Sequence, residues 1–131
     1  MRRRITLIEL PPPRERDIND ELQWLGNSLG LFGDRDRDRS CFRVFITLVK
    51  DTKRSPLSSD QIAGQLDLTR GTVVHHINSL MSAGIVSKER GGYTLRKERL
   101  EELVREMRHD IDAMFLRMDK ISKEIDEWLG L

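Results

Sequence analysis

Residues 58–95 of the chain read SSDQIAGQLDLTRGTVVHHINSLMSAGIVSKERGGYTL, and this stretch decides the fold. Ser58 is followed three residues later by Gln61, which is the spacing of a capping box. In that motif each side chain satisfies a backbone N–H group at the start of a helix. A short helix is therefore expected over residues 59–66, with one buried face made of Ile62, Ala63 and Leu66.

A second helix follows after a turn of two residues. Thr69 is a good N-cap, so this helix is expected over residues 70–83. Gly84 stands where a helix end needs a residue that tolerates positive φ. Apolar positions recur at the spacing that lines one helical face, which predicts that the following side chains point inward: Val73, Ile77 and Leu80.

The stretch ends in a hairpin pattern. Residues 85–86 and 93–95 read as two short strands, and residues 87–92 connect them, with Gly91 and Gly92 supplying the turn. The succession of helix, tight turn, helix and hairpin is the plan of a winged helix-turn-helix. The fold class expected is therefore mainly α, with a small β-hairpin wing.

The same residues resemble the recognition-helix signature of ArsR-type and MarR-type transcription regulators, over about residues 40–96. The resemblance implies a winged helix-turn-helix that binds DNA. Metal-sensing members of the family carry a cysteine pair on the first helix of the motif, whereas this chain has DQIAGQL there. Metal sensing at that position is therefore not expected, and neither a metal nor a cofactor is predicted. The positions that match are Thr69, Thr72, Val73, His76, Ile77, Leu80, Ala83, Gly84, Ile85 and Val86.

Length and composition narrow the class of protein. With 131 residues and a net charge of +1, the chain is one domain plus an appendage, without a strong overall basic field. Charge is distributed unevenly, however: residues 50–96 hold seven basic and four acidic side chains, and residues 97–131 hold seven and ten. No apolar run is long enough to span a bilayer, and no signal peptide is evident. A cytoplasmic protein is expected.

The first half of the chain supplies an arm and two further helices. Residues 1–16 form the expected arm, in which residues 5–10 have the composition of a short strand. The arginines at positions 2–4 can either grip DNA or serve as ordinary terminal charges, and the second reading is slightly favoured. Residues 17–96 form the expected domain. Its first helix is predicted over residues 17–32, with an apolar stripe suited to packing against another helix and Gly33 after its end. That helix packs within its own domain or joins a dimer.

A second helix of the domain, over about residues 40–50, is apolar nearly all round and marks the centre of the core. It carries Cys41, the single cysteine, so an intrachain disulfide is impossible. No base or second thiol lies nearby in the sequence. Cys41 is therefore expected to be a small core residue with no redox role.

Residues 97–131 are expected to form a long dimerisation helix. The stretch is rich in strong helix formers, and proline is absent from it. Its apolar residues follow one another in alternating steps of four and three over about four heptads, which is the signature of a coiled coil. Such a seam needs a partner, so a homodimer is predicted. The seam consists of Leu100, Val104, Met107, Ile111, Met114, Met118, Ile121, Ile125 and Trp128.

The outward face of the second motif helix carries the candidate base-reading residues. A helix in the major groove presents its N-terminal residues to base edges. Arg70 can bind guanine through two hydrogen bonds, Asn78 can bind adenine, and Val74 can touch a thymine methyl group. Gly71 lets the DNA backbone approach closely.

Other residues of the motif suit phosphate contacts. Thr72 lies in the first helical turn, where backbone amides attract phosphate, and His75 can donate to a base or a phosphate. Lys88 and Arg90 are candidates for DNA backbone contacts from the wing. Reading His75 and His76 as a metal site is disfavoured, because adjacent helical residues diverge by about 100°.

Two functions of different kinds remain. The first is a sequence-specific, dimeric regulator that binds double-stranded DNA. The alternative is a winged-helix module for protein–protein contact in transcription or chromosome machinery, which the low net charge favours. A polar outward helix face argues against the alternative, because a docking face would be apolar. No phosphate loop, nucleophile–base pair or metal cluster is recognisable, so an enzyme is not expected. The sequence names no effector.

Overall fold

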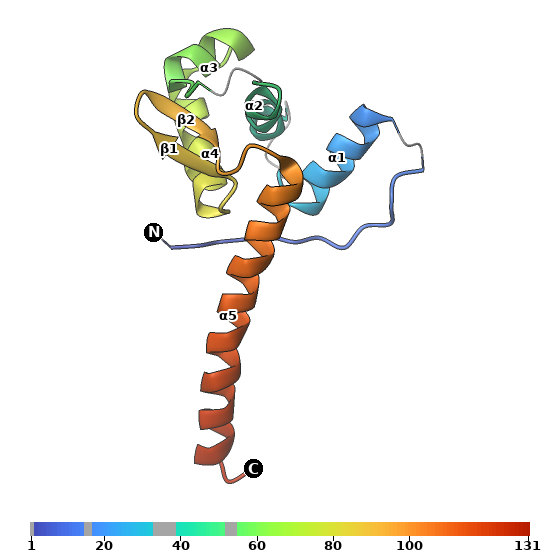
Figure 1. Cartoon of the computed structure of the whole chain (residues 1–131), viewed down its shortest axis with the longest axis vertical. Coiled ribbons are helices and arrows are strands. Elements are labelled where there is room, and N and C mark those ends of the chain that lie inside the picture. Colours follow the sequence, from blue (N-terminus) through green and yellow to red (C-terminus); the bar gives the residue numbers. More distant parts are fainter. Residues whose placement is uncertain (1, 15–16, 33–38, 52–54) are drawn as a thin grey trace. The chain divides into compact units, whose positions relative to one another are not determined.

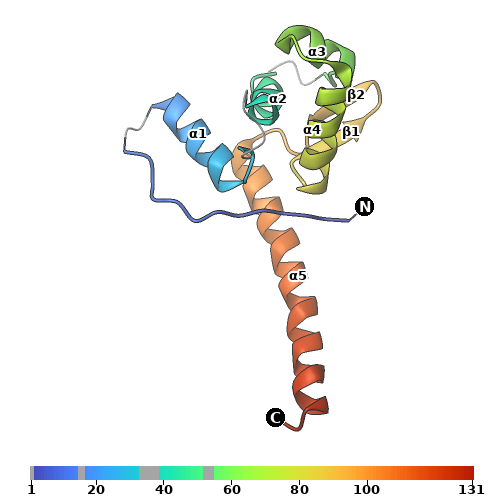
Figure 2. The ribbon, with the colours of Figure 1, turned by 180° about the vertical axis from the view of Figure 1, so that it is seen from behind.

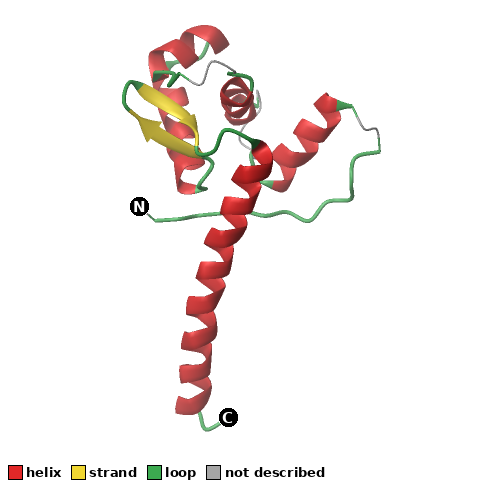
Figure 3. Ribbon diagram, viewed as in Figure 1, coloured by secondary structure: helices red, strands yellow, loops and turns green. Residues whose placement is uncertain are grey.

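The computed structural model describes residues 2–14, 17–32, 39–51 and 55–131, and the chain forms two compact units, Met1–Arg96 and Lys97–Leu131. The second unit consists of the helix α5, Leu100–Trp128. The predicted mainly α fold with a hairpin after the helices is confirmed (Figure 1; Figure 3). In the first unit the elements follow one another as α1 (Ile18–Ser28), α2 (Ser40–Val49), α3 (Ser59–Leu66), α4 (Arg70–Ser82), β1 (Val86–Glu89) and β2 (Gly92–Leu95).

The two helices of the motif begin where their caps predict. Ser58 and Gln61 form the capping box: Gln61 N donates to Ser58 Oγ at 3.1 Å, and Ser58 N donates to Gln61 Oε1 at 2.8 Å. Thr69 caps α4 by accepting the N–H of Thr72 at 3.1 Å. Helix α3 has the predicted bounds, and α4 ends one residue earlier than expected. Gly84 has φ +80°, as its position after the helix requires.

The core of the first unit lies between α2, α3 and α4. Helix α2 packs against both α3 and α4, and α3 packs against α4. Cys41 is buried on α2, in keeping with a small core residue. Seven core side chains have no exposed surface: Val44, Phe45, Ile62, Val73, Ile77, Leu80 and Ile85.

Helix α1 ends four residues before its predicted end. Gly30 has φ +70°, its N–H donates to the Asn27 carbonyl at 3.1 Å, and Leu31 N donates to the Gly26 carbonyl at 2.9 Å. These two bonds are the Schellman arrangement that closes a helix at a glycine. The glycine predicted to follow the helix, Gly33, lies outside the described residues. Phe32 leaves the helix and packs on the ring of Phe42, with 4.6 Å between centroids.

The wing is longer in its strands and shorter in its turn than expected. Strand β1 pairs with β2 in the register Val86↔Leu95, Ser87↔Thr94, Lys88↔Tyr93 and Glu89↔Gly92. Only Arg90 and Gly91 remain between the strands, so the predicted connection over residues 87–92 is wrong. The strands continue through the charged residues Lys88 and Glu89. Both faces of the hairpin are exposed or partly exposed near its tip, so strand positions there accept charged side chains.

Leu57 extends the wing sheet on its other edge. Leu57 N donates to the Tyr93 carbonyl at 3.0 Å, and Tyr93 N donates to the Leu57 carbonyl at 2.8 Å. Gly92 lies so close to this segment that a Cβ there would overlap the Leu57 carbonyl group and approach Ser58 N to 2.8 Å. The start of α3 is thereby fixed to the wing.

The strand expected over residues 5–10 is absent, because the described part of this segment finds helix ends as partners. Arg4 N donates to the Ser82 carbonyl of α4, and Ile8 N donates to the Ser28 carbonyl of α1, both at 2.8 Å. The indole Nε1 of Trp24 donates to the Pro11 carbonyl at 2.8 Å. The backbone groups of residues 4, 8 and 11 thus bond to helical residues rather than to a neighbouring strand.

Helix α5 begins three residues later than the predicted dimerisation helix, and the side chain of its N-cap residue, Arg99, makes no capping hydrogen bond. From Phe115 onward it carries exposed apolar side chains, namely Phe115, Leu116, Met118, Ile121, Ile125 and Trp128, and Leu129 after its end is exposed too. None of the described helices is both long and apolar enough to cross a membrane.

Candidate nucleic-acid interface

Helix α4 separates an apolar inner face from a polar outer face. Val73, Ile77 and Leu80 have no exposed surface, as predicted. Thr72 and Val74 are partly exposed on the flanks. The outer face is polar and exposed along the length of the helix, and its exposed residues are Arg70, Gly71, His75, Asn78 and Ser79.

Arg70 lies beside a carboxylate of the preceding helix. Its Nε atom is 3.7 Å from Asp60 Oδ1, and the two side chains are 72% and 78% exposed. An ion pair so open to water contributes about 0–1 kcal/mol. Arg70 can therefore exchange Asp60 for a guanine or a phosphate at small cost in free energy.

The first turn of α4 is open to an approaching backbone. Nothing lies within 4 Å of the place that a Cβ of Gly71 would take. Thr69 Oγ1 donates to Thr72 Oγ1 at 2.8 Å while it accepts Thr72 N. The Thr72 hydroxyl thus remains available as a donor, at a helix end whose dipole favours anions.

The two adjacent histidines have different surroundings. His75 is exposed, whereas His76 is partly buried and its Nε2 lies 2.6 Å from Ser40 Oγ at the start of α2. His76 therefore joins α4 to α2, and His75 faces outward. Within the described part of the chain, no three His, Cys, Asp or Glu side chains come together as a group that could hold a metal.

The wing carries the remaining predicted DNA contacts. Lys88 lies in β1 opposite Tyr93, and Arg90 lies in the turn at the tip; both are exposed. Helix α4 packs against β1, so the wing stands beside the recognition helix (Figure 2). The predicted seam lies in the other unit, on α5.

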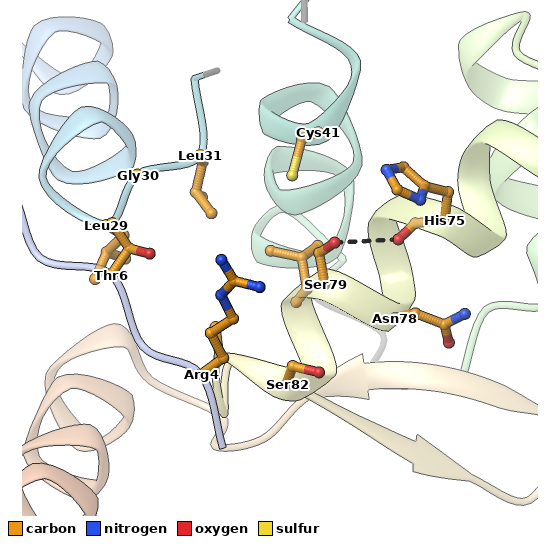
Figure 4. A pocket seen from close by; sticks show the side chains of 12 residues that line it. Arg4, Thr6, Leu29, Gly30, Leu31, Cys41, His75, Asn78, Ser79 and Ser82 are labelled. Atoms are coloured by element: carbon orange, nitrogen blue, oxygen red, sulfur yellow. Dashed lines mark hydrogen bonds between the residues drawn. The ribbon is translucent and has the colours of Figure 1, made fainter. Parts of the chain in front are cut away.

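A hollow of about 390 Å³ borders the C-terminal half of α4 (Figure 4). The Arg4 side chain projects into it from the N-terminal segment, between Leu31 and Ser79. Sequence reasoning did not single out this hollow or Ser79, although Ser79 follows His75 by one helical turn. The residues that line it are Arg4, Thr6, Leu29, Gly30, Leu31, Cys41, His75, Asn78, Ser79, Leu80, Ser82 and Ala83.

Comparison with known proteins identifies the motif. Residues 48–88 match the family model for the bacterial regulatory proteins of the ArsR family. The match includes all of α3 and α4 and reaches into β1. No curated protein and no solved structure matches the chain.

Proposed function

We propose, on the premise that residues 48–88 match the ArsR family model, that the chain is a DNA-binding transcription regulator that binds duplex DNA sequence-specifically as a homodimer. The observation that carries the proposal is the two-sided character of α4. Its inner face is fully buried, and its outer face presents polar side chains with no large apolar patch. A surface for protein docking would be expected to expose apolar side chains instead.

Base recognition is assigned to the outer face of α4. Arg70 at the start of the helix binds guanine, and Asn78 binds adenine two turns later, each through a pair of hydrogen bonds. Val74 lies between them for contact with a thymine methyl group. Thr72 and His75 suit phosphate oxygens, and Lys88 and Arg90 hold the DNA backbone from the wing.

Dimer formation is assigned to the exposed part of α5. Ile121, Ile125 and Trp128 are 53%, 51% and 89% exposed, and they continue the unbroken heptad seam. A stripe of this kind is unusual on the surface of a monomer. The occupant that fits is a second copy of the same helix, because an identical heptad pattern supplies knobs and holes of the same spacing.

A dimer with two-fold symmetry implies a particular kind of site. Its two recognition helices would bind half-sites that are roughly palindromic and lie about 34 Å apart, or a multiple of that distance. A regulator of this kind acts by binding, and catalysis is not part of the proposal.

The test is a salt titration of binding to a preferred duplex and to a random duplex, for the wild type and two variants. Arg70→Ala is expected to cost about 1–3 kcal/mol on the preferred site and to relax preference at one base pair. Lys88→Ala is expected to weaken binding to both duplexes alike and to lower the salt slope by about one unit. Absence of salt-dependent binding by the wild type to any duplex would contradict the proposal and favour a protein-contact role.

A further inference from the structure

The N-terminal segment is held at the C-terminal end of the recognition helix. Arg4 N donates to the Ser82 carbonyl at 2.8 Å, and the Arg3 guanidinium donates to the Met81 carbonyl at 3.3 Å. Farther along, Ile8 N donates to the Ser28 carbonyl. Figure 2 shows the segment passing beneath the end of α4. Hydrogen bonds thus hold one end of this segment to α4 and the other end to α1.

These bonds change the electrostatics of the end of α4. The last carbonyl groups of a helix carry about half a negative charge, which repels anions. Helix α4 has no basic residue in its own last turn. The segment supplies a guanidinium and an N–H group from elsewhere in the chain, so two of these carbonyls have donors. An anion near this end meets arginine side chains rather than bare carbonyl groups.

The hollow beside α4 is lined by hydrogen-bond donors. Arg4 contributes a guanidinium and Ser82 contributes a hydroxyl group, whereas the Ser79 hydroxyl donates to the His75 carbonyl at 3.3 Å. None of the described residues that line it is acidic, and residues 2–8 hold three arginines and no carboxylate. Arg2 and Arg4 are both exposed. This set of groups suits a phosphate oxygen.

The distance along α4 from Arg70 to the hollow also suits a contact with the DNA backbone. Ser82 follows Arg70 by twelve residues, which is about 18 Å along a helix axis. The major groove is about 12 Å wide. A helix that presents Arg70 to the bases therefore places its far end beside the DNA backbone at the edge of the groove, rather than over base edges.

We propose that Arg2 and Arg4 of the N-terminal segment, together with Ser82 of α4, bind phosphates of the duplex DNA backbone next to the groove that α4 enters. The inference rests on the proposed function and extends the interface to a part of the chain outside the helix-turn-helix. The contact is independent of sequence, because it reaches phosphates and no bases.

The test compares the double variant Arg2→Ala/Arg4→Ala with the wild type in a salt titration on a random duplex. The loss of two phosphate contacts is expected to lower the salt slope by about two units. Between about 50 and about 200 mM salt, the wild type should then lose about 12-fold more affinity than the variant. Alanine keeps the backbone N–H of residue 4, so the bond to Ser82 and the thermal midpoint should be retained.

A second double variant controls for the loss of charge. Arg14→Ala/Lys50→Ala also removes two exposed positive charges, and neither residue lines the hollow. Its salt slope should equal that of the wild type. Equal slopes for both double variants would overturn the inference. If Arg70→Ala still relaxes base preference in that case, the proposed function stands without the arm. A wild type that binds no duplex overturns both.

Discussion

At the scale of single residues, Gly71 is a glycine that the protein itself does not require. It lies in the first turn of α4, its φ is not positive, and a Cβ would meet nothing within 4 Å. Glycine inside a helix costs about 0.5–1 kcal/mol relative to alanine. Under the proposed function, close approach of a DNA backbone is a benefit that offsets this cost.

Gly71→Ala is accordingly expected to raise the free energy of unfolding by about 0.5–1 kcal/mol while it weakens DNA binding roughly tenfold, or about 1.4 kcal/mol. Urea unfolding and a binding titration measure the two effects separately. Gly64 of α3 offers the matched control, because it is also a helical glycine with open space around it. Gly64→Ala should gain similar stability and bind DNA like the wild type. Unchanged DNA binding by Gly71→Ala would refute this role.

At the scale of elements, the interactions that could be predicted from the sequence were those between residues within one helical turn of each other. Ser58, Gln61 and Thr69 cap their helices as expected, because a cap depends only on residues three positions apart. The end of α1 was mispredicted because two glycines, Gly30 and Gly33, lie close together and sequence alone does not say which one adopts positive φ. The bonds of residues 4 and 8 depend on partners far along the chain, which composition does not reveal.

The wing shows how one backbone contact determines the position of an element. Gly92 lies against the Leu57 carbonyl, with φ +154°. Gly91 also has positive φ, at +92°, but a Cβ at that position would meet nothing within 4 Å. Alanine at either position strains the backbone, and only alanine at 92 must also displace residue 57.

Gly92→Ala is therefore expected to destabilise the protein by about 1–3 kcal/mol more than Gly91→Ala does, since overpacking adds to the backbone strain. Chemical denaturation of both variants gives the difference from the shift in midpoint at constant slope. Equal losses of stability would mean that the wing shifts away from Leu57 without cost.

At the scale of the whole molecule, the site and the dimer are less determined by the sequence than the fold is. The positions of Arg70, Asn78 and His75 on one exposed face followed from helical periodicity. Their roles toward bases and phosphates stay predictions, as does the seam on α5, because both depend on partners that periodicity cannot name. Contact of the arginines at positions 2–4 with DNA was one of two readings of the sequence, but the place of Arg4 beside α4 could not be inferred, since it follows from a bond to Ser82.

The dimer can be tested without damage to the single chain. Ile121 and Ile125 are about half exposed in α5, so Ile121→Glu/Ile125→Glu should leave the protomer folded. In a dimer, however, each change buries an unpaired charge at a cost of several kcal/mol. Sedimentation at micromolar concentration should show a dimer for the wild type and a monomer for the variant.

The control for this experiment alters charge on the other side of the same helix. Lys120 and Lys123 are exposed and lie off the heptad seam. Lys120→Glu/Lys123→Glu changes the net charge more than the isoleucine variant does, and yet it should remain dimeric. A monomeric wild type, or dissociation of both variants alike, would argue against the seam.

The bonds between the N-terminal segment and α4 also impose an order on assembly. Arg3 and its acceptor Met81 are separated by 78 positions in the chain. At a synthesis rate of about 5–20 residues per second, the ribosome needs about 4–16 s to reach the acceptor after it has made the donor. The N-terminal segment is thus translated first but reaches its bound position last. Helix α4 must be complete before Arg3 and Arg4 can bond to the carbonyl groups at its end.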